Sequence, residues 1–315
     1  MAFVALFPGQ GSQAVGMLSD LAVSHPVIQH TFTEASDALG YDLWALAQHG
    51  PADQLSLTEI TQPLLLTAGV ALLRAWTEAG GAAPQYACGH SLGEYSALTA
   101  FGAFGLTDAV RVVQARGQFM QAAVPAGTGA MAAVLGLDDA VIEGICLEVA
   151  AELGDVVEAV NYNAPGQLVI AGHQRAVEAA LPRLKAAGAK RALPLPVSAP
   201  FHCALMRPAA ERLADVLAEV PLQSPTVPVI QNVSMRPETD PEQIRSQLIT
   251  QTFSPVRWTQ TIQGLQALGV KVAAEFGPGA VLCGLAKRIE TEVAHAPLGT
   301  VAQFDHALQQ VGDIA

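Results

Sequence analysis

Short apolar runs alternate with amphipathic segments along most of the chain. Phe3–Phe7 is an uninterrupted apolar run that predicts a short buried strand, and Tyr86–Cys88 predicts a second one. Apolar positions at helical spacing predict helices over residues 25–46, 63–79, 92–100 and 107–123. We expect Thr107 and Asp108 to cap the last of these helices. Strands that alternate with helices favour an α/β fold with a largely parallel sheet.

Residues 129–197 follow a different order. We predict strands at 130–135, 156–162, 168–171 and 191–195, and helices at 138–153 and 175–187. The resulting βαββαβ order is that of a ferredoxin-like unit. Proline-containing stretches flank it at 125–127 and 194–200. We therefore predict a large α/β domain formed by residues 1–126 and 198–315, with a small ferredoxin-like domain, residues 127–197, inserted into it.

Composition and charge narrow the classes of function. The formal net charge is -12 and no basic tract is present, so no nucleic acid partner is expected. The cysteines at 88, 146, 203 and 283 form no C-x-x-C pair, which favours buried, reduced thiols over a metal site or a disulfide scaffold. The longest apolar stretch, residues 64–76, is too short to span a bilayer. The N-terminus lacks the positively charged region of a signal peptide. We expect a cytoplasmic protein with no membrane partner.

A candidate nucleophile follows the second predicted strand. Gly89-His90-Ser91-Leu92-Gly93 spells G-x-S-x-G between a strand and a helix, which is the context of a nucleophile elbow in an α/β-hydrolase-like domain. The serine hydroxyl would lie at the helix N-terminus, where free N–H groups can stabilise an oxyanion. The alternative is a serine that only caps the helix, between glycines needed for packing.

A serine nucleophile needs a base, and His202 is the candidate. It lies where the chain returns from the inserted unit to the large domain, and clefts between domains commonly hold ligands. A hydrogen-bonded core histidine is the alternative interpretation. His90 is adjacent to Ser91, but neighbouring side chains on a tight turn diverge, so we expect a structural role for His90.

The segment Gly9–Ala14 spells G-x-G-x-x-A directly after the first strand, as in a dinucleotide-binding loop. Such a site needs an acidic residue at the end of a second strand about 20 residues further on. Residues 27–39 are helical by period instead, so the nucleotide interpretation is not favoured. The two glycines are better explained by a loop that presents Gln10 beside the elbow.

Further motifs, in order along nearly the whole chain, resemble one known family, the malonyl-CoA:acyl carrier protein transacylases and the related acyltransferase domains of polyketide synthases. The matching segments are Phe7–Gln13, Thr61–Pro63, Gly89–Ala97, Arg116–Gly117, Asn163–Gln167, Phe201–His202, Gln251, Pro255–Trp258 and Glu275–Gly279. The resemblance implies a ping-pong transfer of malonyl from malonyl-CoA to the phosphopantetheine thiol of acyl carrier protein, through a malonyl-serine ester. It implies fatty acid synthesis as the pathway, with a stand-alone polyketide acyltransferase as the alternative. It implies no metal and no redox cofactor.

The resemblance also assigns roles to individual residues. Ser91 is the nucleophile and His202 the base, which the main-chain carbonyl of Gln251 orients. The backbone N–H groups of Gln10 and Leu92 form the oxyanion hole.

Arg116 is expected to bind the malonyl carboxylate, because a guanidinium offers a carboxylate two parallel hydrogen bonds. A solvated helix face is the alternative interpretation of this residue. Met120 lies one turn later on the same helix and is expected to line the acyl pocket. Phe201 resembles the bulky residue of malonyl-selective acyltransferases, so a methyl-branched acyl group should fit poorly.

The carrier protein is acidic in this family, so docking needs local positive charge on this acidic chain. The adjacent basic pairs are Lys190-Arg191 and Lys287-Arg288, and solvated surface charge is the alternative for both. No long exposed heptad is present, and a monomer is expected.

Two rival functions stay open at this point. A serine hydrolase or thioesterase would use an acid such as Asp240 with His295 or His306, and it leaves the inserted unit unexplained. A non-catalytic module that binds carrier protein would form no covalent adduct.

Overall fold

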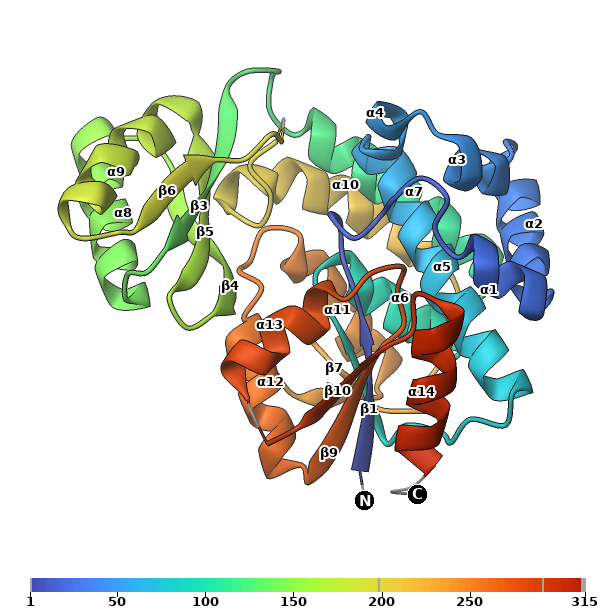
Figure 1. The fold of residues 1–315 in the computed structure, drawn as a ribbon. Coiled ribbons are helices and arrows are strands. Elements are labelled where there is room, and N and C mark those ends of the chain that lie inside the picture. The colour runs from blue at the N-terminus through green and yellow to red at the C-terminus, as the bar shows by residue number, and fades with distance from the viewer. Residues whose placement is uncertain (1, 198, 291, 313–315) are drawn as a thin grey trace.

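The computed structural model describes residues 2–197, 199–290 and 292–312. These residues form two separate sheets, each with its own helices (Figure 1). The larger sheet has the strand order β10-β9-β1-β2-β7-β8. Its strands are β1 (Ala2–Phe7), β2 (Tyr86–Gly89), β7 (Val229–Ile230), β8 (Pro237–Glu238), β9 (Val270–Glu275) and β10 (Ala294–Pro297). Neighbouring strands run parallel except for β7 and β8.

Helices surround the larger sheet. Before the second sheet they are α1 (Ser19–Ser24), α2 (Val27–Leu39), α3 (Leu43–His49), α4 (Ala52–Leu55), α5 (Thr58–Glu78), α6 (Leu92–Ala100) and α7 (Leu106–Ala122). After it come the 3-10 turn η1 (Ala204–Met206), α10 (Arg207–Ala218), α11 (Pro241–Gln251), α12 (Trp258–Ala267), α13 (Val281–Ile289) and α14 (Val301–Gly312). None of the described helices is long and apolar enough to cross a membrane.

The central strand β1 is buried on both faces. Phe3, Ala5 and Phe7 pack into the core formed with α2, α5, α6, α7 and α14, whereas Val4 and Leu6 pack into the core formed with α12 and α13. A strand covered on both faces has no polar alternation, which explains the uninterrupted apolar run in the sequence.

The second sheet is antiparallel and has the order β4-β5-β3-β6. Its elements are β3 (Gly129–Leu135), α8 (Asp139–Leu153), β4 (Val157–Ala164), β5 (Gln167–His173), α9 (Gln174–Ala186) and β6 (Arg191–Pro194). This βαββαβ order and the mostly parallel first sheet confirm the predicted fold class. The predicted domain division at residues 126/127 and 197/198 stays a prediction, and Met1, Ser198 and residues 313–315, where its segments begin or end, lie outside the described residues.

Three details of the predicted helices are wrong. The helix expected over residues 25–46 is two helices, because Gly40 adopts φ 78° and ends α2. The helix expected from residue 63 begins at Thr58 and carries Pro63 inside it. No side chain caps its start, so the proline was the only start signal that could be recognised. Thr107 and Asp108 do not cap α7, which begins at Leu106 after Gly105.

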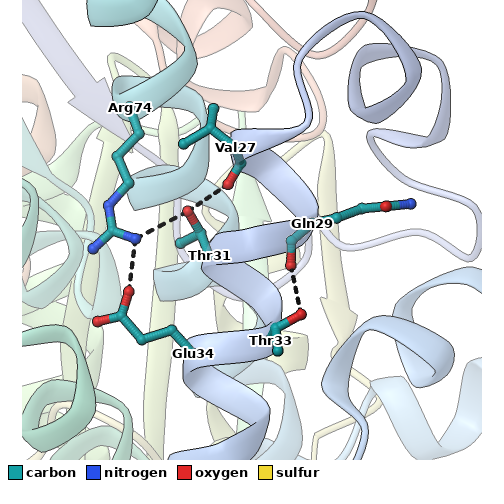
Figure 2. A network of polar contacts seen from close by, with 6 residues as sticks. All are labelled: Val27, Gln29, Thr31, Thr33, Glu34 and Arg74. Carbon is teal, nitrogen blue, oxygen red and sulfur yellow. Dashed lines mark hydrogen bonds and ion pairs between the residues drawn. The ribbon is translucent and has the colours of Figure 1, made fainter.

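A polar network links α2 to the long helix α5. The guanidinium of Arg74 on α5 donates to Glu34 Oε2 at 2.7 Å and to Thr31 Oγ1 at 3.1 Å, both on α2 (Figure 2). The Thr31 hydroxyl in turn donates to the carbonyl of Val27 at 2.7 Å. These contacts join α2 to α5, although exposed ion pairs of this kind contribute little to stability.

Candidate active site

Ser91 lies in a sharp turn between β2 and α6. Its φ of 54° and ψ of -108° are rarely adopted by a residue with a side chain. A Cβ on Gly93 would lie 1.9 Å from the carbonyl oxygen of Phe7, so only glycine lets α6 pack this closely against β1. The turn therefore has the strand–serine–helix geometry of a nucleophile elbow.

His202 faces Ser91 across the turn. The Ser91 Oγ and His202 Nε2 atoms are 2.7 Å apart, and His202 Nδ1 lies 3.0 Å from the main-chain oxygen of Gln251. Because a carbonyl only accepts hydrogen bonds, Nδ1 carries the proton and Nε2 is free to accept the serine proton. Burial, with the positive charge of Arg116 as a second cause, lowers the pKa of His202 to about 3. The imidazole is therefore neutral at physiological pH, as a base must be.

Arg116 on α7 is 1% exposed and points into the same site. Its guanidinium donates to Gln62 Oε1 at 2.9 Å, to Gln251 Oε1 at 2.9 Å and to Ser91 Oγ at 3.2 Å. The Nε atom has no hydrogen-bond partner, and no ion pair between described residues includes this arginine. Burial disfavours the charged guanidinium and lowers its pKa from the ordinary value. A negatively charged group bound beside Arg116 would therefore stabilise the guanidinium.

Gln251 forms hydrogen bonds with Ser91, His202 and Arg116. Its main-chain carbonyl accepts from His202, its Oε1 accepts from Arg116, and its Nε2 donates to the Ser91 carbonyl at 3.0 Å. The sequence indicated only the main-chain carbonyl. The side-chain contacts were missed, as was Gln62, because neither glutamine carries a local signal of its partner.

A single cavity gathers most of the predicted site residues. Its lining includes Ser91, Leu92, His202, Arg116, Met120, Phe201 and Gln10. Met131 on β3 and Asn161 on β4 also line it, so the second sheet contributes to the cavity together with the turn after β2. A second cavity shares Gln10 and Phe201 with it and continues along the start of α5.

The loop after β1 lies against the elbow. A Cβ on Gly9 would lie 2.6 Å from the His90 carbonyl oxygen, so the glycine allows the contact that sets Gln10 at the cavity. Leu92 is the first residue of α6, where a helix has no internal partner for its N–H. His90 bonds through Nε2 to Asn163 Oδ1 at 2.8 Å, and burial lowers its pKa.

The four basic residues lie outside the cavity. Lys190, Arg191, Lys287 and Arg288 are all exposed and none lines it. The Arg288 guanidinium donates to Gln167 Oε1 on β5, and Gln167 and Arg191 both pair with Leu135 in the sheet. The two pairs therefore lie near each other, at one end of the small sheet.

The residues that a hydrolase would need lie elsewhere. Asp240 caps α11 by accepting the Gln243 N–H at 2.8 Å, and neither His295 nor His306 lines the cavity of Ser91. The four cysteines are buried and unpaired. In the described part of the chain, no three His, Cys, Asp or Glu side chains are grouped so that they would hold a metal ion.

Comparisons with known proteins agree with this geometry. Residues 3–302 match the acyl transferase domain family. The chain is 56% identical over 307 residues to the malonyl CoA-acyl carrier protein transacylase of Escherichia coli strain K12, over 98% of this chain and 99% of that protein. The fold matches the solved transacylase of that name from Coxiella burnetii with a TM-score of 0.96 and 48% identity, over 99% and 98% of the two chains. A malonyl-transacylase solved in complex with a type II polyketide synthase acyl carrier protein matches with a TM-score of 0.96 and 52% identity, over 98% and 100%.

Proposed function

This chain belongs to the acyl transferase family, and we propose that it transfers malonyl from malonyl-CoA to the phosphopantetheine thiol of an acyl carrier protein. The observation that carries the proposal is one cavity in which a serine–histidine pair lies beside a buried arginine that has no carboxylate partner among the described residues. The pair supplies nucleophilic catalysis, and the arginine supplies a site for an acyl group that carries a carboxylate.

In the first half-reaction, Ser91 Oγ attacks the thioester carbonyl while His202 Nε2 accepts the serine proton. The backbone N–H groups of Gln10 and Leu92 stabilise the oxyanion, and loss of one such donor typically costs about 10²–10³ in rate. The carbon–sulfur bond then breaks, and His202 returns the proton to the leaving coenzyme A thiol. Malonyl remains as an ester on Ser91.

The second half-reaction reverses the first with a different thiol. His202 takes the proton of the phosphopantetheine thiol, whose sulfur attacks the ester carbonyl. The carbon–oxygen bond breaks and Ser91 regains its proton. This acid–base cycle balances without a metal or a redox cofactor, and we propose that the enzyme uses neither.

Arg116 selects the acyl group. The guanidinium binds the malonyl carboxylate by two parallel hydrogen bonds, whereas an acetyl group would leave it buried and unpaired. Met120 and Phe201 line the same cavity and limit its width, so a methyl-branched acyl group is disfavoured.

The kinetic pattern tests the proposed function. Initial rates measured against malonyl-CoA at several carrier protein concentrations should give parallel double-reciprocal lines, because coenzyme A leaves before the acceptor binds. Intersecting lines would contradict a covalent intermediate. Free malonate formed in place of malonyl carrier protein would favour a hydrolase.

We propose that Lys190, Arg191, Lys287 and Arg288 dock the acidic carrier protein. Reversal of all four charges to glutamate should raise the KM for carrier protein about tenfold or more, because long-range attraction becomes repulsion. Turnover with free pantetheine should not change. The control replaces Arg175 and Arg183, which form ion pairs with Asp155 and Glu152 on the small domain. An equal rise in KM for the control would contradict this docking site.

We further propose a cytoplasmic monomer that supplies fatty acid synthesis. Four buried, unpaired thiols are typical of a reducing compartment. Residues of a single chain line the cavity, so catalysis needs no second copy. A type II polyketide carrier protein, as in the solved complex, would use the same chemistry.

A further inference from the structure

A buried side-chain amide, that of Asn232, bonds the turn that carries the nucleophile. Asn232, which follows β7, is 1% exposed. Its Oδ1 accepts the Ser91 N–H at 2.8 Å, and its Nδ2 donates to the Gly89 carbonyl oxygen at 2.7 Å. These two backbone groups stand on either side of His90. One side-chain amide therefore bonds both ends of the turn that carries Ser91.

Glu94 holds Asn232 in turn. It lies in the first turn of α6, is fully buried, and accepts the main-chain N–H of Asn232 at Oε2 with a distance of 2.7 Å. No ion pair between described residues includes Glu94, although the Gln251 side chain and the positive charge of Arg116 favour its ionised form. Burial raises its pKa to about 7. Burial of a carboxylate in this position is destabilising. We therefore look for a role of the Glu94–Asn232 hydrogen bond other than core packing.

The helix side of the turn is already secured by other bonds. The Gly93 N–H donates to the His90 carbonyl at 2.9 Å, and the Glu94 N–H donates to the Ser91 carbonyl at 3.1 Å. Neither bond fixes the Ser91 N–H, whose peptide plane is oriented by the unusual φ of that residue. The amide of Asn232 is the contact that fixes it.

We propose that Glu94 and Asn232 are positioning residues that hold Ser91 in its positive-φ conformation, with Oγ directed at His202. The inference rests on the proposed function in that Ser91 must be the nucleophile. Because Asn232 occupies the Ser91 N–H, that group is also kept out of the oxyanion hole. Neither residue lines the cavity, so neither contacts the acyl group directly, although the Glu94 carboxylate also interacts electrostatically with Arg116.

The test compares five variants with the wild-type chain: Asn232→Ala, Glu94→Ala, Glu94→Gln, the double variant Asn232→Ala/Glu94→Ala, and the control Gln231→Ala. Gln231 is an equally buried neighbouring amide that bonds only within its own segment, to the Val229 carbonyl. The measurements are the rate of malonyl-serine formation in a single turnover, the malonyl-CoA concentration at half-saturation, and the Tm.

Asn232→Ala and Glu94→Ala should each slow acylation about 10²-fold at an unchanged half-saturating concentration, because misplacement of an attacking atom by about 1 Å has that effect. Glu94→Gln keeps an acceptor for the Asn232 N–H and should acylate at the wild-type rate. The double variant should be no slower than Asn232→Ala, since Glu94 acts through Asn232. Gln231→Ala should acylate at the wild-type rate whatever its Tm.

A folded Asn232→Ala variant that acylates at the wild-type rate would overturn the proposal. If Asn232→Ala does not fold, the acylation rates of Glu94→Ala and Glu94→Gln are compared instead. Equal rates for these two variants would overturn the proposal. A rate loss in Gln231→Ala as large as in Asn232→Ala would also do so. A wild-type chain that forms no malonyl adduct would instead contradict the proposed function.

Discussion

The His202→Ala variant is expected to lose about 10⁴–10⁶ of the malonyl transfer rate, as is typical when the base of a nucleophilic serine is removed. The 2.7 Å contact between Ser91 Oγ and His202 Nε2 supplies the only proton acceptor that the described residues place at the serine hydroxyl. Without it, the hydroxyl must attack with its proton attached. Transfer to carrier protein in a continuous coenzyme A release assay measures the loss.

The matched control for this variant is His306→Ala on α14. A serine hydrolase that used a C-terminal histidine would lose activity there and not at residue 202. The present account expects His306→Ala to retain the wild-type rate, because His306 does not line the cavity. A His202→Ala variant that is folded and still within tenfold of the wild-type rate would contradict the account.

The Arg116→Ala variant should lose malonyl selectivity. Removal of one partner of a buried charge pair costs about 3–5 kcal/mol, so kcat/KM for malonyl-CoA is expected to fall about 10²–10⁴-fold. The kcat/KM for acetyl-CoA should fall much less or rise, because the acetyl group no longer leaves a guanidinium unpaired. The ratio of the two kcat/KM values is the measurement.

Two further variants separate charge from geometry. Arg116→Lys keeps the charge but loses the planar fork, and it should recover only part of the selectivity. Arg111→Ala removes an exposed arginine of the same helix that donates to the Ala38 carbonyl, and it should leave the ratio unchanged. An unchanged ratio in Arg116→Ala would show that the carboxylate is bound elsewhere.

Local sequence patterns predicted the strands and helices that position the active-site residues. The apolar run of β1 and the G-x-S-x-G turn after β2 depend on neighbouring residues, so the position of Ser91 between a strand and a helix could be inferred from the sequence. The βαββαβ order of the small sheet was predictable for the same reason. Helix boundaries were less so, because α5 and α7 begin without a side-chain cap.

Contacts between distant segments could not be inferred in this way. Asn232 is 141 residues from Ser91 and Gln251 is 160 residues from it, and neither lies in a motif with a spacing rule. In the sequence, a buried amide side chain cannot be distinguished from an exposed polar one. Only the packing of β7 and α11 around the elbow shows that these two side chains bond the N–H and the carbonyl of the same serine.

The central claim is a malonyl ester on Ser91, and the intact mass of the chain after incubation with malonyl-CoA tests it most directly. The account predicts a single malonyl adduct on the wild-type chain, a weak adduct with acetyl-CoA, and none on the Ser91→Ala variant. Addition of carrier protein should remove the adduct and yield malonyl carrier protein. An adduct that persists in Ser91→Ala, or turnover to malonyl carrier protein with no adduct on the wild-type chain at any time, would contradict the account.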